Sequence, residues 1–424
     1  MHSACSPDAE QSRRQPHATA ELDESFTAAC RTIWAAGRNL KSGLNDLHDP
    51  QRRSLTRKGI RFAALAATSA ALIAQPAIAS TNAPMTPDEA SAVALPGAPI
   101  NDRILPLRPR GRARIAASVN GSGRGGVYQV TSNGSNVRVR VYTSRSFKTW
   151  SAATNRMWAQ RFADMPHGSE ISKLTVYLSP FSEISSEWVC GFRADSCYDP
   201  NDGVMYLSGE RPPDGSDMSQ IAMHEYGHHI ANHRSNVPWD SVNWGPKYWS
   251  SAQQVCVNTR QSRMWPSDAA NHYEDHPGEI WAETYRLVAS AAIGVKSDPW
   301  EILSPIWNPA SRPDLLTAAG KDVSQPWPGP RLLKKTGTFA TPGPAEQLTV
   351  LPMALDGEVT ASISTSGGLK ASVSIRDTST GKVIGPSSAS RARATACGVS
   401  SVTIVVKRTS GRGSWSLDIR HPGS

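Results

Sequence analysis

The chain has 424 residues, 39% of them hydrophobic, and its 45 Lys and Arg against 36 Asp and Glu give a net charge of +9 at pH 7. This excess is mild for the length, and no basic run interleaved with aromatic residues occurs in the central part, which argues against a nucleic-acid-binding protein. An attraction to anionic cell surfaces is compatible with the charge.

The N-terminal region has the pattern of an export signal. After a polar leader, basic residues at positions 52–61 precede an apolar run at 62–74, and Ala77-Ile78-Ala79 form a small-residue cleavage site. We expect residues 1–79 to be a leader and signal peptide and the mature chain to be secreted. The run is short for a membrane span, so no stable span is expected after cleavage, with an uncleaved anchor as the alternative. Arg52-Arg53 weakly resembles a twin-arginine signal, which leaves the export route open.

Cleavage after Ala79 removes ten Lys and Arg and seven Asp and Glu, and so leaves a net charge of about +6. Residues 80–123 are rich in Pro, Ala, Gly and Arg without sustained periodicity. This composition is typical of a linker or pro-segment that forms no core.

From Val137 the sequence becomes periodic. Alternating or apolar runs predict strands at 137–144, 173–179 and 203–209, and residues 151–165 predict a helix. With a further helix beginning near Asp217 or Ser219, the order is β-α-β-β-α. The sequence thus predicts a mixed α and β domain over residues 124–330.

Four cysteines follow the cleavage site. An even number in an oxidising compartment favours disulfides, and the stretch CGFRADSC predicts a short loop closed by Cys190 and Cys197. Cys256 and Cys397 would then join two distant regions, with buried thiols as the alternative for that pair.

The stretch MHEYGHHIANH contains an H-E-x-x-H pattern. On a helix, His224 and His228 lie one turn apart on the same face, where one cation can contact both, and Glu225 is placed to act as a general base. At about 100° per residue, His229 and His233 point away from His224, so we expect both to be surface histidines. A catalytic zinc site needs a third ligand from further along the chain.

Two blocks follow the motif. Tryptophans in the stretches at 237–249 and 263–268 either line a substrate cleft or anchor surface loops. After a breaker at Pro277-Gly278, Glu279 begins an apolar helical run, and Glu283 shares its face. We expect Glu279 to bind the metal and Glu283 to accept a hydrogen bond from a ligating imidazole, although either could reach the metal.

The block HEYGH, followed about fifty residues later by EIWAE, resembles the gluzincin zinc metallopeptidases, in particular the lethal-factor-like branch with an E-x-x-A-E block. The resemblance covers roughly residues 137–292. It implies a zincin-like fold, one zinc ion per chain, Glu279 as third ligand and Glu225 as base.

The resemblance also implies a tyrosine that stabilises the oxyanion. Tyr273, six residues before Glu279, is similar to that residue, with His272 and His276 as rivals. In such folds an edge strand above the metal pairs with an extended peptide. The candidate strand, alternatively a purely structural one, comprises Val204, Met205, Tyr206 and Leu207.

After Trp327 the alternating runs are separated by Gly, Ser and Asp, which predicts a small antiparallel β-sandwich over residues 335–424. It weakly resembles accessory domains of secreted peptidases, with adhesion, tethering or protection as possible roles.

The sequence therefore predicts an α+β protein: a zincin-like domain followed by an all-β sandwich. Its expected activity is zinc-dependent hydrolysis of peptide bonds in polypeptide substrates. One rival is a catalytically silent secreted binding or adhesion protein on the same scaffold. The other is a zinc hydrolase of non-peptide amides.

Overall fold

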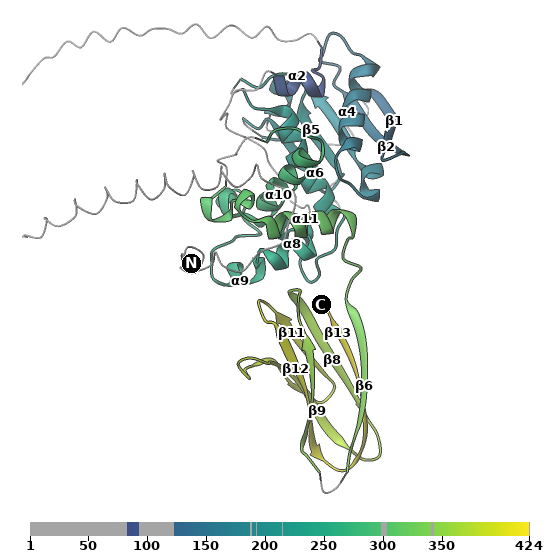
Figure 1. Cartoon of the computed structure of the whole chain (residues 1–424), viewed down its shortest axis with the longest axis vertical. Coiled ribbons are helices and arrows are strands. Elements are labelled where there is room, and N and C mark those ends of the chain that lie inside the picture. The colour runs from purple at the N-terminus through teal and green to yellow at the C-terminus, as the bar shows by residue number, and fades with distance from the viewer. Residues whose placement is uncertain are drawn as a thin grey trace, which may run out of the picture. The chain divides into compact units, whose positions relative to one another are not determined.

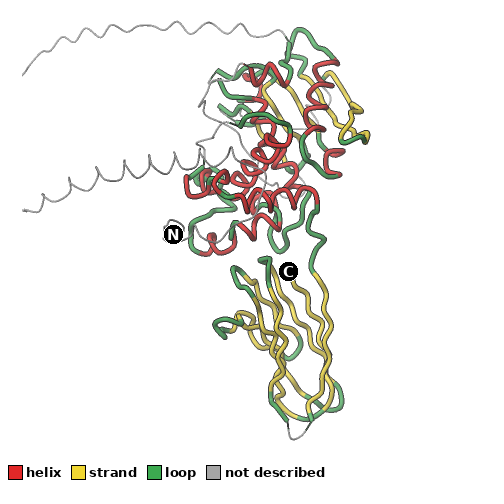
Figure 2. Tube along the Cα trace, viewed as in Figure 1, coloured by secondary structure: helices red, strands yellow, loops and turns green. Residues whose placement is uncertain are grey.

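The computed structural model describes residues 83–92 and 123–423, except for residues 187–188, 192, 214, 298–302 and 341–342. The predicted signal peptide and most of the predicted linker lie outside the described residues. The described chain has a mixed α and β part followed by antiparallel strands (Figures 1 and 2). Among the described helices, none combines the length and the apolar character that crossing a bilayer requires.

A five-stranded sheet forms the first layer, in the order β1-β2-β3-β5-β4. Asn133 and Gly134, with φ of 47° and 76°, make the tight turn between the antiparallel β1 and β2. β2, β3 and β5 are parallel, and β4 runs antiparallel to β5. The strands are β1 (Arg124–Ser132), β2 (Ser135–Thr143), β3 (Thr175–Ser179), β4 (Ser196–Asp199) and β5 (Val204–Ser208).

The strand order corrects one prediction. β5 contains the candidate substrate strand Val204 to Leu207, but it lies between β3 and β4 and is hydrogen-bonded on both sides. Its backbone groups are already paired, so it cannot take up an extended peptide. The edge of the sheet on this side is β4.

Helices pack against the sheet and around one another. α4 (Ala152–Asp164) contributes the fully buried Trp158 and Phe162, and α6 (Met218–Asn232) and α10 (Pro277–Ala292) contribute Tyr226 and Trp281 to the same core. The other helical elements are α5 (Phe181–Ile184), α7 (Ser241–Trp244), α8 (Lys247–Ala252), α9 (Val255–Arg260), α11 (Pro313–Ser324), η2 (Ser169–Lys173), η3 (Tyr273–Asp275), η4 (Pro305–Trp307) and η5 (Pro309–Ser311).

A short segment before β1 also joins this core. It includes α2 (Pro87–Ala92); Met85 N donates to Gly209 O over 2.7 Å, and Trp158 Nε1 donates to Met85 O over 2.8 Å. Met85 and Ala90 are buried in the core. The expectation that residues 80–123 form no core is therefore wrong for this segment, because its few apolar residues are held by hydrogen bonds to distant parts of the chain.

The C-terminal strands form two four-stranded antiparallel sheets, ordered β10-β9-β12-β7 and β11-β8-β13-β6, around a separate apolar core. Trp415 fills the space above Gly337, where an added Cβ would lie 2.5 Å from its ring. The strands are β6 (Arg331–Phe339), β7 (Glu346–Pro352), β8 (Gly357–Thr365), β9 (Lys370–Asp377), β10 (Val383–Ser388), β11 (Arg391–Ala396), β12 (Ser401–Ser410) and β13 (Gly413–His421).

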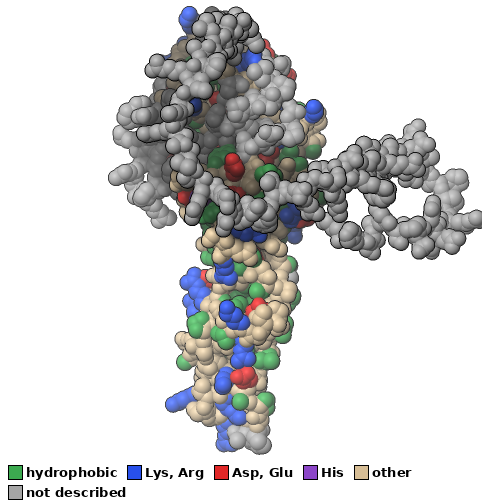
Figure 3. Space-filling model, turned by 90° about the vertical axis from the view of Figure 1, so that its left-hand side faces the viewer, with side chains coloured by type: hydrophobic (Ala, Val, Ile, Leu, Met, Phe, Trp, Pro, Cys, Tyr) green, Lys and Arg blue, Asp and Glu red, His purple; other side chains and the backbone are tan. Residues whose placement is uncertain are grey.

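Of the two parts of the chain that follow residue 123, the C-terminal strands carry the net positive charge. Residues 331–424 contain twelve Lys and Arg against five Asp and Glu, whereas residues 124–330 contain eighteen against twenty-one. Figure 3 shows basic side chains spread over the C-terminal strands. Any attraction to an anionic surface should therefore act mainly through this part of the chain.

Two disulfides are present. Cys190, in the loop that leads into β4, is bonded to Cys197 in β4 itself. Cys256 in α9 is bonded to Cys397, which directly follows β11. These are the two pairs expected from the sequence.

Candidate metal centre

Helix α6 carries the H-E-x-x-H pattern and is buried along nearly its whole length. Asp217 caps its N-terminus, since Oδ1 accepts hydrogen bonds from Ser219 N over 2.8 Å and from Gln220 N over 3.0 Å. The cap fixes where the helix begins, and so fixes which side chains face α10.

Two small residues let the ligand-bearing helices approach each other. A Cβ added to Gly227 on α6 would lie 2.8 Å from Ala282 Cα on α10. That contact involves backbone, so no side-chain rotation could relieve it. Trp281 Nε1 also donates to Gly227 O over 2.7 Å. The small residues inside the two sequence blocks thus set the spacing that brings Glu279 to the histidines.

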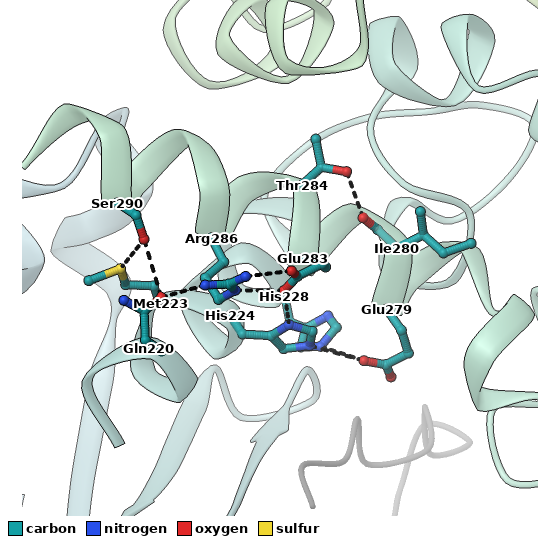
Figure 4. A network of polar contacts seen from close by, with 10 residues as sticks. All are labelled: Gln220, Met223, His224, His228, Glu279, Ile280, Glu283, Thr284, Arg286 and Ser290. Atoms are coloured by element: carbon teal, nitrogen blue, oxygen red, sulfur yellow. Dashed lines mark hydrogen bonds and ion pairs between the residues drawn. The ribbon is translucent and has the colours of Figure 1, made fainter. Parts of the chain in front are cut away.

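Three side chains converge between the helices (Figure 4). Glu279 Oε2 lies 3.1 Å from His224 Nε2 and 3.3 Å from His228 Nε2. One ligand atom from each residue falls within a common span of 4.8 Å, and all three side chains are fully buried. The structure therefore contains a buried His-His-Glu group that could hold a metal ion.

The hydrogen bonding of this group fits a cation. Among the described residues, His228 Nε2 and Glu279 Oε1 have no hydrogen-bond partner although both are buried. Burial raises the pKa of the Glu279 carboxyl, but His228 and His224 outweigh it and hold that pKa well below its usual value. Two imidazoles and a carboxylate are a donor set that zinc accepts.

Glu283 occupies a different position from Glu279. Its Oε2 lies 3.8 Å from His224 Nδ1, the nitrogen that points away from Glu279. Glu283 therefore lies on the outer side of the His224 ring, and Glu279, not Glu283, belongs to the group that could hold a metal ion.

Glu225 also lies fully buried, beside β4. Ser196 Oγ donates to Glu225 Oε1 over 2.6 Å. The sequence did not identify Ser196, because it lies in a four-residue strand directly before a disulfide cysteine and no periodicity marks it.

Tyr273, His272 and His276 are the candidate stabilisers of an oxyanion. Tyr273 is half-buried in η3, and its role stays a prediction. His272 stacks on Trp265 with ring centroids 4.1 Å apart. His276 is buried, and its Nε2 lies 3.1 Å from Pro266 O. His272 and His276 thus have structural contacts of their own.

The other two histidines of the motif correct a prediction. His229 is fully buried rather than on the surface, and His233 is half-buried. His229 Nδ1 lies 3.1 Å from Tyr198 Oη, and His229 Nε2 lies 3.0 Å from Glu170 O. His229 does point away from His224, as expected, but that side of α6 faces protein and not solvent.

The tryptophans between the two blocks have packing roles. Trp249 is fully buried and its Nε1 donates to Thr284 Oγ1 over 3.1 Å. Trp239 stacks on Trp244 with centroids 4.8 Å apart, and both are partly exposed. Trp249 is therefore an anchor, while a contact of the stacked pair with substrate stays a prediction.

No protein-family model and no curated protein sequence matches the chain. Among solved structures, it is similar to a Yersinia pseudotuberculosis-derived mitogen, at 17% identity over 21% of this chain and 85% of that chain, with a TM-score of 0.18. It is also similar to the pre-peptidase C-terminal domain of a Bacillus anthracis collagenase, at 13% identity over 20% of this chain and 87% of that chain, with a TM-score of 0.18. These likenesses span only about a fifth of the chain, and at such TM-scores they bear on neither fold nor function.

Proposed function

We propose that the protein is a secreted, zinc-dependent endopeptidase of the gluzincin type with a zincin-like catalytic domain. The observation that supports this most is the convergence of His224, His228 and Glu279 on one buried point, with the buried Glu225 next to His224 in the chain. A purely structural helix pair has no need to bury two imidazoles and two carboxylates together, because each such group costs free energy when it leaves water.

The residues divide the chemistry among them. His224, His228 and Glu279 would hold zinc, which when bound lowers the pKa of a water towards ~7 and polarises a carbonyl. Glu225 takes the proton from the attacking water and delivers it to the leaving amine. Ser196, which donates to Glu225 Oε1, keeps that carboxylate in one orientation.

β4 is the edge strand, and Ser196 on this strand contacts the proposed base. All four residues of β4 are buried. The strand therefore supports the base rather than presenting a free edge to a peptide. Secretion is supported by the two disulfides, which persist in oxidising compartments.

The test combines metal analysis with a peptide-library digest. We expect one zinc ion per mature chain and cleavage of internal peptide bonds. Glu225→Gln preserves shape but cannot accept the proton, so zinc should stay and turnover should fall by roughly three or more orders of magnitude. Glu274→Gln, an exposed change in the same part of the chain, is the matched control and should leave both unchanged.

Each rival predicts a different result. Stoichiometric zinc without hydrolysis of any peptide would favour a hydrolase of other amides. Absence of zinc would favour a binding or adhesion protein. Comparable turnover in the Glu225→Gln variant would remove Glu225 from the mechanism.

A further inference from the structure

Behind the metal-site residues lies a buried arginine that the sequence did not single out. Arg286 on α10 is completely buried. Its Nε donates to Glu283 Oε2 over 2.7 Å and its Nη2 donates to Glu283 Oε1 over 2.6 Å. This two-point contact fixes the plane of the Glu283 carboxylate as well as its position.

The same guanidinium contacts the other ligand helix. Arg286 Nη1 donates to Gln220 Oε1 over 2.5 Å, and Gln220 lies on α6 one turn before His224. Gln220 is itself held in place, because its Nε2 donates to Lys296 O over 3.2 Å and its Oε1 accepts from Ser290 Oγ over 3.2 Å. Arg286 thus joins both helices that supply metal ligands (Figure 4).

The carboxylate that Arg286 holds is the one that faces His224. Glu283 Oε2 lies 3.8 Å from His224 Nδ1, and Nε2 on the far side of the same ring faces Glu279. At 3.8 Å the contact between Glu283 and His224 is electrostatic and not a hydrogen bond. A carboxylate beside the outer nitrogen favours a proton on that nitrogen, and so favours the tautomer whose other nitrogen can bind a metal. A change in the orientation of the Glu283 carboxylate would therefore also change the orientation of the His224 ring, and with it the position of the nitrogen that faces the metal.

We infer that Arg286 is a positioning residue for the metal site: its bidentate contact with Glu283 orients His224 and so raises the affinity of the site for zinc. This inference rests on the proposed zinc function. It applies to His224 alone, because Glu283 lies beside His224 Nδ1, whereas no described carboxylate lies within ion-pair distance of His228 Nδ1.

Lysine cannot replace arginine in this role. An ammonium group keeps the charge, but it has no planar fork that binds both carboxylate oxygens in parallel. Arg286→Lys is therefore the informative variant, since it avoids an uncompensated buried carboxylate and removes the geometric constraint.

The chain supplies a matched control. Arg234 and Glu170 form a second buried pair, with Arg234 Nη1 2.9 Å from Glu170 Oε2, and Arg234 also donates to the carbonyls of His233 and of α11. Arg234→Lys makes the same chemical exchange in a pair whose described hydrogen bonds and ion pairs do not reach the His-His-Glu group.

The experiment measures zinc affinity of the full mature chain by competition with a chromophoric chelator at pH 7. We expect Arg286→Lys to bind zinc about 10- to 100-fold more weakly than wild type, and Arg234→Lys to bind it as wild type does. In the cobalt-substituted proteins, the visible absorption bands should shift for Arg286→Lys alone, because they report ligand geometry.

The outcomes separate the two claims. If wild type binds zinc and Arg286→Lys binds it equally tightly with the same cobalt spectrum, the inference is overturned while the proposed function stands. If wild type binds no zinc, both are overturned. Should Arg286→Lys fail to fold, Glu283→Gln decides, since it keeps the shape but loses the charged bidentate pair; unchanged zinc affinity in that variant also overturns the inference.

Discussion

Two sides of helix α6 carry histidines in different hydrogen-bonding environments. His224 and His228 face α10, where His228 Nε2, the nitrogen beside Glu279, has no hydrogen-bond partner among the described residues. On the other side, both ring nitrogens of His229 lie within hydrogen-bond distance of a partner, Tyr198 Oη and Glu170 O. Burial lowers the pKa of His229 to about 3, so that ring is neutral.

The difference shows that burial and residue type do not by themselves identify a metal ligand. Four histidines lie within ten residues of one helix, yet only two direct ring nitrogens towards a shared carboxylate oxygen. What separates them is the hydrogen bonding of each ring nitrogen. The side facing α10 is a candidate functional site, and the opposite side is part of the structural core.

The largest expected effect tests the structural side. Arg234 holds Glu170 in a buried pair, so Glu170→Gln should lower the free energy of unfolding at pH 7 by about 3–5 kcal/mol. Urea unfolding measures this loss. Zinc affinity should stay unchanged, and a parallel loss of zinc would mean that the two sides are not independent.

The same pair predicts a pH dependence. Burial raises the pKa of the Glu170 carboxyl, but Arg234 and the Gly168 N–H hold it below its ordinary value. A depressed folded pKa stabilises the protein above the unfolded pKa of about 4.3, and this stabilisation disappears as pH falls through the folded value. Unfolding free energies between pH 7 and pH 3 should therefore decline less steeply in Glu170→Gln than in wild type.

The next effect tests the metal side. Structural zinc sites with four protein ligands bind with about 10–16 kcal/mol, or about 2.5–4 kcal/mol per ligand. Loss of one of the three ligands in His228→Ala should therefore weaken zinc binding about 100- to 1,000-fold. Chelator competition provides the measurement. His229→Gln, the neighbouring change, should keep zinc and lose about 1–3 kcal/mol of stability because a buried partner is removed. Equal zinc affinities in the two variants would contradict the assignment.

A smaller effect should appear in the stability and in the zinc affinity of the same variant. Gly227→Ala places a Cβ 2.8 Å from Ala282 Cα, so we expect a loss of about 1–3 kcal/mol and weaker zinc binding as the helices separate. Gly320→Ala in α11 is the control, since nothing lies within 4 Å of its added Cβ. That variant should gain up to about 1 kcal/mol. Thermal unfolding with and without zinc compares the two, and a stabilised Gly227→Ala would refute the close approach.

The smallest effect compares two residues of β4. Tyr198→Phe removes the hydroxyl near His229 Nδ1 and should cost about 1 kcal/mol of stability without changing turnover. Ser196→Ala removes the donor to Glu225 and should lower turnover about 5-fold, equivalent to about 1 kcal/mol, while zinc stays bound. Both variants are tested by denaturant titration and by peptide hydrolysis. Tyr198→Phe should lower the stability and keep the turnover, and Ser196→Ala should lower the turnover.

The metal-site residues were accessible from the sequence because helical periodicity depends only on local spacing. That rule places His224 and His228 on one face, and a second helix with Glu279 fits the same pattern. The spacing predicts the direction in which a side chain points from the helix, but not what packs against that side of the helix. For this reason His229 was expected in solvent. Only the packing of Glu170 and Tyr198 shows that this side is enclosed.

Long-range pairing was not accessible in the same way. A four-residue strand such as β4 has no readable alternation, so the edge position was assigned to the longer run at Val204 to Leu207. The only sequence indication of Arg286 is its position three residues after Glu283 in a mainly apolar run. Opposite charges at this helical spacing usually form an ion pair exposed to solvent. Met85 was missed because a short segment gives no periodicity.

The contact between Gly227 and Ala282 also determines at which step the three side chains of the candidate metal site lose their conformational freedom. Because the helices meet there through backbone, the three ligand side chains are already close together in the folded chain. Their conformational freedom is lost as the core forms, so little remains to be lost when an ion arrives. Such a site should therefore act as a rigid chelator, whose selectivity among ions is governed by the fixed spacing of its donor atoms.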